Sequence, residues 1–178
     1  KESSAASDVY KRQMSELRSV PCEDDVELGP LSEEVLTDLA PLAENKGIAL
    51  NCAGDALVIG SDTLLYRLVF NLVENAIRYS RTGSTVNVSI SDSDSHVFLR
   101  VEDQGPGIPK QYRESIFQPF FRLDKSRSRA YGGAGLGLAL VWEIAALHGG
   151  TVEVETSSEN GTTMLASLPK RSAALTEQ

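Results

Sequence analysis

The chain is poor in cysteine and lacks long apolar runs. Its two cysteines, Cys22 and Cys52, are too few and too isolated for a disulfide framework or a zinc site, which favours a reducing compartment. No run of about 18 apolar residues occurs, so the chain as given is not expected to span a membrane. A secretory signal is lacking too. Together these absences favour a chain that works in a reducing compartment and does not itself span a membrane.

Basic residues are outnumbered, and histidines are rare. The formal net charge of −8 argues against a nucleic-acid partner, because that binding needs a broad basic surface. The exception is the basic stretch over residues 122–129, which suits a triphosphate better than a duplex. Both histidines, His96 and His148, are expected to be structural or surface residues.

Length and composition predict one main domain. The 178 residues, 41% of them hydrophobic, can bury one substantial core. Residues 1–25 are polar without a clear period and are expected to be poorly structured. Residues 26–170 hold the predicted elements, and residues 171–178 form a C-terminal tail.

Helical spacing of apolar residues predicts two helices in the first half of the chain. The first is expected to begin at a capping Ser32 and to end at Gly47, with Pro41 kinking or weakening it. Ser61 or Asp62 is expected to cap the second, longer helix. Its buried stripe comprises Leu64, Leu65, Leu68, Val69, Leu72, Val73, Ala76 and Ile77.

Strand patterns occur between these two helices and after the second one. Residues 48–52 and 56–59 are strand candidates, and alternation predicts two antiparallel pairs, 85–90 with 96–102 and 151–156 with 162–168. Helices gathered on one face of such a sheet give an α+β fold. We expect a two-layer sandwich in which a mixed, mostly antiparallel sheet packs on about three helices.

Two asparagines lie one helical turn apart near the end of the longer helix. Asn75 offers a neutral carbonyl oxygen suited to Mg²⁺, which binds few protein groups beside substrate phosphates. Asn71 can orient a ligand but cannot accept a proton at neutral pH, so it is no general base. A nucleotide held here should not be hydrolysed quickly by this domain alone.

Three further segments carry binding chemistry. Residues 103–107, Asp-Gln-Gly-Pro-Gly, place a carboxylate at a strand end before a tight turn. Residues 117–122 are an aromatic cluster ending in Arg122, beside the basic stretch. Residues 132–137, Gly-Gly-Ala-Gly-Leu-Gly, open a helical run and so offer backbone N–H groups to an anion.

In this order and spacing the four segments resemble the N, G1, F and G2 boxes of the sensor histidine kinases of two-component signalling. The resemblance covers about residues 26–170 and is jointly specific, although each motif alone is weak. It implies the Bergerat ATP-binding fold, shared with gyrase, certain chaperones and mismatch-repair ATPases. The lid sequence Phe-Arg-x-Asp at residues 121–124 is similar to that of one large kinase class.

The resemblance implies Mg-ATP as cofactor and a role for each matching residue. Asn75 would hold Mg²⁺, Asn75 and Arg122 would act in catalysis, and Asp103 would accept a hydrogen bond from the adenine amine. The implied nucleotide contacts are Asn71, Asn75, Arg78, Tyr79, Asp103, Gly105, Gly107, Ile108, Arg122, Gly133, Gly135, Leu136 and Gly137. Phe117, Phe120 and Phe121 are expected to be packing anchors of the ATP lid.

The family's phosphoacceptor histidine is missing. Neither His96 nor His148 stands in the His-Glu or His-Asp context of the acceptor helix. The resemblance therefore implies transfer to a histidine on a separate dimerisation domain, of which residues 14–20 would be the frayed end. A response regulator receiver domain would be the next partner. The parent protein would be a membrane-anchored homodimer, with this chain as its cytoplasmic end.

Two alternatives stay open. Related ATPases and serine kinases carry a glutamate at the place of Asn71, and here it is absent; the neighbouring Glu74 lies about 100° around the helix from Asn75. The other alternative is an interaction module in which ATP merely orders the lid for a partner.

Overall fold

The computed structural model describes residues 4–123 and 136–170. In these ranges the helices are α1 (Ser4–Arg18), α2 (Leu28–Asn45), α3 (Asp62–Tyr79) and α5 (Gly137–Leu147), with short 3₁₀ turns η1 (Lys110–Tyr112) and η2 (Ser115–Phe117). The strands are β1 (Asp24–Glu27), β2 (Ala49–Ala53), β3 (Leu57–Gly60), β4 (Thr85–Asp92), β5 (His96–Asp103), β6 (Thr151–Ser158) and β7 (Gly161–Pro169). None of the helices in the described ranges has the length and apolarity to cross a bilayer.

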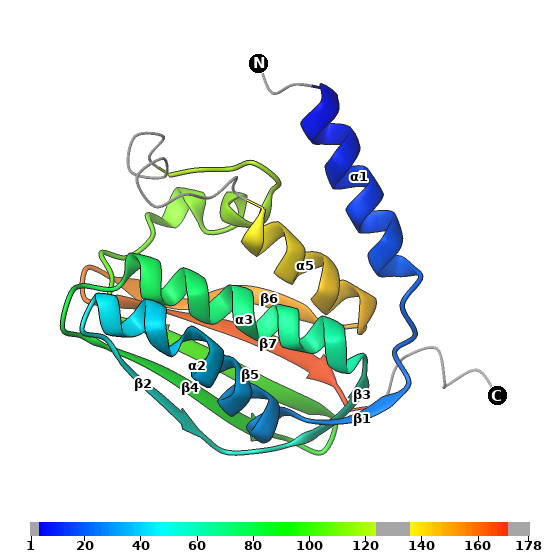
Figure 1. Ribbon diagram of the computed structural model, residues 1–178, viewed down its shortest axis with the longest axis horizontal. Coiled ribbons are helices and arrows are strands. Elements are labelled where there is room, and N and C mark those ends of the chain that lie inside the picture. The colour runs from blue at the N-terminus through cyan, green and yellow to red at the C-terminus, as the bar shows by residue number, and fades with distance from the viewer. Residues whose placement is uncertain (1–3, 124–135, 171–178) are drawn as a thin grey trace.

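The core of the fold is a five-stranded sheet covered on one face by α2, α3 and α5 (Figure 1). The strand order is β2-β4-β5-β7-β6; β2 pairs with β4 in parallel, and the other neighbours are antiparallel. Strands β1 and β3 form a separate two-stranded sheet. The predicted α+β two-layer sandwich with a mixed, mostly antiparallel sheet is confirmed, as are both predicted hairpins.

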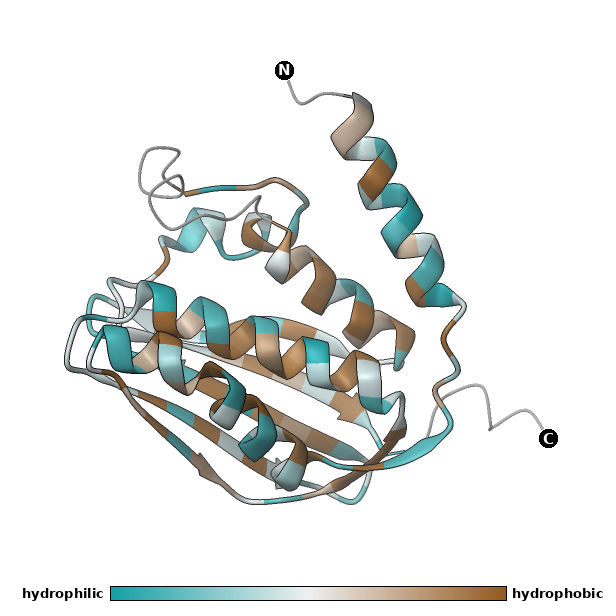
Figure 2. Ribbon diagram, viewed as in Figure 1, coloured by the Kyte–Doolittle hydropathy of each residue, from teal (hydrophilic) through white to brown (hydrophobic). Residues whose placement is uncertain are grey.

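Helix α3 forms as its sequence predicts. Ser61 is the N-cap, and its side chain accepts a hydrogen bond from the backbone N–H of Leu64. Asp62 in the first turn and Arg78 in the last turn match the helix dipole. All eight residues of the predicted stripe are buried. In Figure 2, α5 is the most uniformly hydrophobic helix, which fits its place between the sheet and α1.

The predicted start of α2 is wrong. The helix begins at Leu28, about one turn before Ser32, and its N-cap residue Glu27 makes no side-chain cap. Instead the Asp55 carboxylate Oδ1 accepts from the backbone N–H of Gly29 at 2.7 Å. Ser32 is fully buried inside the helix. The cap comes from a residue remote in sequence, so local pattern cannot reveal it.

Residues 4–18 form α1, so the prediction of a poorly structured N-terminal segment is wrong for them. Met14 and Leu17 are buried in the same core as the other helices. The Tyr10 ring lies 6.0 Å from the Phe120 ring, and Arg18 lies 3.8 Å from Glu143 of α5. Tertiary packing of a few apolar side chains thus orders a largely polar sequence. That α1 is the end of a dimerisation helix stays a prediction.

Candidate functional site

Helix α3 and the start of α5 bring Asn71 and Gly137 together. Asn71 is half-buried at the edge of the stripe, and its Nδ2 donates to the Arg67 carbonyl at 2.7 Å. A Cβ on Gly137 would lie 3.2 Å from Asn71 Oδ1, a tight contact that a larger residue could make only if the Asn71 side chain shifted. Asn75, one turn further along α3, is half-buried as well. The helix that carries the two amides therefore lies next to the last glycine of residues 132–137.

A cavity of about 190 Å³ lies at this junction. The residues that line it come from α1, α3 and the start of α5: Tyr10, Gln13, Met14, Arg67, Asn71, Leu136, Gly137 and Leu140. Three of the predicted nucleotide contacts, Asn71, Leu136 and Gly137, therefore share one cavity. The contribution of α1 to its wall was not predicted from the sequence.

Asp103 is the buried carboxylate at the end of β5. Asp103 is only 7% exposed. Its Oδ1 accepts hydrogen bonds from the backbone N–H groups of Gly105 at 2.9 Å and Thr162 at 3.2 Å. Burial raises the pKa of Asp103, and the two backbone donors oppose that rise. Both N–H groups donate to the same carboxylate oxygen, Oδ1. The carboxylate is thus held in one orientation by backbone alone.

The turn after Asp103 needs glycine for close backbone packing. A Cβ on Gly105 would lie 2.6 Å from the Tyr79 carbonyl oxygen, and one on Gly107, whose φ is +84°, would lie 2.1 Å from the Ser158 carbonyl oxygen. The Ile108 N–H donates to Ser157 Oγ at 2.8 Å. Glycine is thus needed at these positions because the turn packs closely against the protein's own backbone. This reason adds to the predicted close approach of the turn to a ligand.

The end of α3 is held by a residue that the motifs do not include. Lys46, the C-cap residue of α2, donates from Nζ to three backbone carbonyls around the last turn of α3. Arg78 in that turn pairs with Glu74 at 3.2 Å, and Tyr79 is 45% exposed. A lysine directly before the helix-ending Gly47 was the only sequence signal, and it does not tell which helix the ammonium caps.

Each ring of the aromatic cluster lies against another aromatic ring. Phe117 is buried and its ring lies 5.5 Å from that of Trp142 in α5, while the Phe121 ring lies 5.9 Å from that of Tyr112. Phe120 adopts a positive φ of 64° and contacts α1 through Tyr10. Arg122 is half-buried. The predicted contacts Gly133 and Gly135 and the basic residues Lys125, Arg127 and Arg129 lie outside the described residues.

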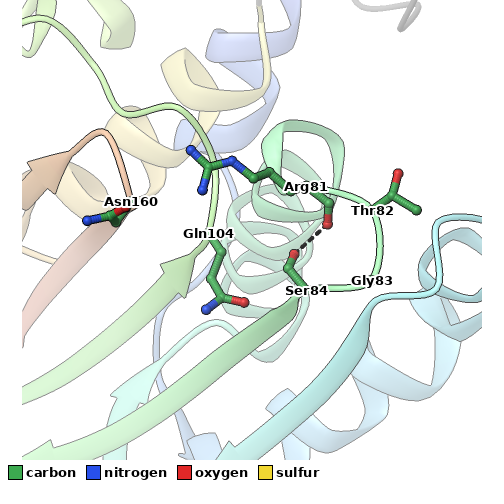
Figure 3. A pocket seen from close by; sticks show the side chains of 6 residues that line it. All are labelled: Arg81, Thr82, Gly83, Ser84, Gln104 and Asn160. Atoms are coloured by element: carbon green, nitrogen blue, oxygen red, sulfur yellow. Dashed lines mark hydrogen bonds between the residues drawn. The ribbon is translucent and has the colours of Figure 1, made fainter.

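A second, more open cavity of about 390 Å³ contains none of the predicted contacts (Figure 3). It is lined by Arg81, Thr82, Gly83, Ser84, Gln104 and Asn160. Arg81 lies just after the end of α3, and Gln104 lies within residues 103–107. The Arg81 guanidinium donates to the Glu159 carbonyl at 2.6 Å. Gln104 Oε1 accepts from the Thr85 N–H at 2.8 Å, whereas Asp103 Oδ1 accepts from the N–H groups of Gly105 and Thr162. The larger cavity is therefore separate from the Asp103 side of the turn.

His148 is structural, as predicted. It is 4% exposed; its Nε2 accepts from the Ser61 N–H at 3.0 Å, and its Nδ1 lies 2.7 Å from the Ile144 carbonyl oxygen. This pair of contacts requires the neutral ring with the proton on Nδ1. Burial lowers the pKa of His148 accordingly. His148 joins the end of α5 to the start of α3 and has no nitrogen available to receive a phosphoryl group.

Comparisons with known proteins identify the family of this domain. Residues 60–172 match the family model described as histidine kinase-, DNA gyrase B- and HSP90-like ATPase. Sensor-like histidine kinase SenX3 of Mycobacterium tuberculosis is 38% identical over 152 residues, which are 84% of this chain and 37% of SenX3. The chain thus spans little more than a third of that relative's length.

Solved structures show the same domain. The mycobacterial sensor histidine kinase MprB is 31% identical with a TM-score of 0.73, over 84% of this chain and 99% of that one. Full-length ShkA in complex with AMPPNP is 28% identical with a TM-score of 0.76, over 90% of this chain and 34% of that one. The chain therefore belongs to the histidine kinase-, DNA gyrase B- and HSP90-like ATPases, as an ATP-binding catalytic domain of the sensor histidine kinase kind.

Proposed function

We propose that this domain positions Mg-ATP so that the γ-phosphoryl group passes to a histidine on a dimerisation domain of the parent protein, and from there to an aspartate of a response regulator. The observation that carries the proposal is the meeting of Asn71 on α3 with Leu136 and Gly137 at the start of α5, in one cavity. The parent protein would be a membrane-anchored homodimer with this domain in the cytoplasm.

Adenine recognition falls to Asp103. A buried carboxylate held through Oδ1 by two backbone donors can accept a hydrogen bond from the adenine amine, and it would face a carbonyl oxygen in guanine. Gly105 approaches the Tyr79 carbonyl next to Arg78 at the end of α3, and Gly107 and Ile108 approach Ser158 and Ser157 of β6. Full-length ShkA, one of the similar structures, is described in complex with AMPPNP, an analogue of ATP.

Magnesium fits the donor set only together with the nucleotide. Among the described residues, no group of three or more His, Cys, Asp or Glu side chains could hold a metal ion. Mg²⁺ characteristically keeps several waters and binds through substrate phosphates and one or two protein oxygens, which the Asn75 amide can supply. When bound, the ion would neutralise charge on the phosphate oxygens, and Arg122 would add to this neutralisation.

The site favours group transfer over hydrolysis of ATP. Asn71 is an amide and cannot take a proton from water. The nearest carboxylate on the helix, Glu74, is paired with the Arg78 guanidinium at 3.2 Å. Phosphoryl transfer needs positioning and charge neutralisation more than a base, so this arrangement supports a kinase rather than an ATPase of the gyrase type.

Calorimetric titration with AMPPNP tests the nucleotide site. The unsubstituted domain, called the parent domain below, should bind the analogue more tightly with Mg²⁺ than without. Asn75→Ala should remove that difference because it removes the side-chain oxygen that binds the ion. Asn51→Ala is the matched control, since Asn51 is an exposed amide on β2 bonded to Asn87. An Asn75→Ala isotherm that still responds to Mg²⁺ would contradict the role of Asn75.

Mixing the domain with a separately produced dimerisation domain and γ-labelled ATP tests the reaction. Label on a histidine of the added domain supports the kinase. Rapid release of free phosphate by the domain alone would instead support an ATPase. Nucleotide binding without either product would favour the interaction module, in which ATP only orders the lid.

A further inference from the structure

The ammonium group of Lys46 binds the end of α3 through three backbone oxygens. Its Nζ donates to the carbonyls of Ile77 at 2.9 Å, Arg78 at 2.9 Å and Ser80 at 2.8 Å. The last carbonyls of a helix have no partner inside the helix, and a cation there also matches the helix dipole. Burial lowers the pKa of Lys46, in keeping with an ammonium partly withdrawn from water.

Lys46 itself is fixed in place by its backbone. Its N–H donates to the Ala43 carbonyl at 3.1 Å, and its own carbonyl accepts from the Gly83 N–H at 3.0 Å. The first bond anchors Lys46 to α2, and the second ties it to the loop that follows α3. Its side chain therefore starts from a defined position and spans from one helix to the end of the next.

The segment capped by Lys46 contacts the turn that follows β5. Ser80 Oγ accepts from the Gln104 N–H at 3.2 Å. The Tyr79 carbonyl oxygen lies 2.6 Å from where a Cβ on Gly105 would stand, so the two backbones touch. Lys46 thus holds the end of α3 through hydrogen bonds, and this end of α3 contacts the turn that follows the Asp103 carboxylate.

We propose that Lys46 is a positioning residue for the nucleotide site; this inference rests on the proposed function. Three carbonyls that converge on one ammonium repel one another when the cation is removed, because each has the same partial charge. Without the ammonium the last turn of α3 relaxes, and Arg78 and the turn after Asp103 move with it. Lys46 touches no nucleotide in this scheme and acts through the backbone.

Substitution of Lys46 by methionine tests the proposal, since methionine keeps an unbranched side chain and loses the donors. AMPPNP with Mg²⁺ should bind Lys46→Met about tenfold more weakly than the parent, within the usual range for coupling between neighbouring positions and a site. Lys170→Met is the matched control: its Nζ pairs with Asp92 at 2.6 Å at the other end of β5, and affinity should not change. Parent-like affinity in Lys46→Met would overturn the inference.

Chemical rescue separates the ammonium's role from general structural damage. Lys46→Ala leaves room at the three carbonyls, and ethylammonium chloride should restore most of the lost affinity because its N–H groups can donate to them. Tetramethylammonium chloride at the same ionic strength has the same charge but no N–H and should not restore it. Equal effects of the two salts would overturn the proposal.

The other possible results also test either the role of Lys46 or the proposed function. If Lys46→Met does not fold, Lys46→Gln replaces it, because glutamine removes the cation but keeps an unbranched polar side chain; unchanged affinity in that variant overturns the inference. If the parent domain itself fails to bind AMPPNP, the proposed function fails. If the parent binds and Lys46→Met binds equally well, only the role of Lys46 fails.

Discussion

Asp103 shows how one side chain can be both buried and charged. Burial raises its pKa, while the amides of Gly105 and Thr162 stabilise the charged form. Those amides occupy Oδ1 and fix the plane of the carboxylate. A ligand with a hydrogen-bond donor in that plane would be favoured over one with an acceptor.

Replacement of Asp103 by asparagine should therefore weaken ATP binding. We expect a loss of about 1.5 to 3 kcal/mol, the range for a hydrogen bond to a charged group. Calorimetric titration measures it, with Asp94→Asn in the exposed β4–β5 turn as the control. Equal affinity of the parent domain for ATP and GTP would contradict the role given to Asp103.

His148 makes stability depend on pH. The neutral ring accepts the Ser61 N–H, and protonation of Nε2 would turn that acceptor into a second donor. Because the folded-state pKa lies below the usual 6.5, the unfolded chain binds the proton more readily. The contribution of His148 is fully present above about pH 6.5 and is lost as pH falls from there towards the folded-state pKa.

Urea unfolding of the parent and of His148→Gln at pH 8 and at pH 5.5 measures this effect. The free energy of unfolding of the parent should fall more between the two pH values than that of the variant, which has no ring to protonate. Acidic side chains titrate in both proteins and so cancel in the comparison. Equal pH dependence in the two would show that protonation of His148 does not cost folding free energy.

At the scale of elements, the sequence pattern predicts those helices and strands that are determined by interactions between residues close in sequence. The stripe of α3, its Ser61 cap and both hairpins were predictable because period, cap and turn all act within a few residues. The start of α2 was not predictable, because Asp55 reaches it from 26 residues away. Asn71 and Asp103 could be found from motifs, whereas the cap by Lys46 depends on tertiary packing.

The two capping candidates of α2 should behave in opposite ways. Asp55→Ala removes the acceptor for the Gly29 N–H and should lower the free energy of unfolding by about 0.5 to 2 kcal/mol. Ser32→Ala should cost nothing or stabilise by up to about 1 kcal/mol, because the buried Ser32 hydroxyl has no hydrogen-bond partner in the described structure. Denaturant titration of both variants checks this. A loss in Ser32→Ala as large as in Asp55→Ala would restore Ser32 as the cap.

At the scale of the whole molecule, α1 belongs to the same core as the nucleotide-binding layer. Its sequence is mostly polar, and the apolar contacts that order it, Met14 and Leu17, meet partners far along the chain. Composition therefore predicted a poorly structured segment, because a pattern search over one segment cannot include partners from another. The packed helix also adds Tyr10 and Gln13 to the wall of the Asn71 cavity.

Leu17→Ala tests this packing. Leu17 is 4% exposed, so truncation should lower the free energy of unfolding by about 2 kcal/mol or more. Ser15→Ala, at an exposed position of the same helix, should change it by less than about 0.5 kcal/mol. Denaturant unfolding followed by circular dichroism gives both values. Indistinguishable variants would mean that α1 does not pack on the domain in solution.

Trp142 gives the molecule an optical property of its own. It is the chain's single tryptophan, it is 48% exposed, and its ring lies against that of Phe117 in η2. Indole fluorescence shifts in colour and brightness with hydration and with nearby rings. Any rearrangement of the aromatic cluster would thus be visible in the natural emission of the unlabelled protein, with no background from other indoles.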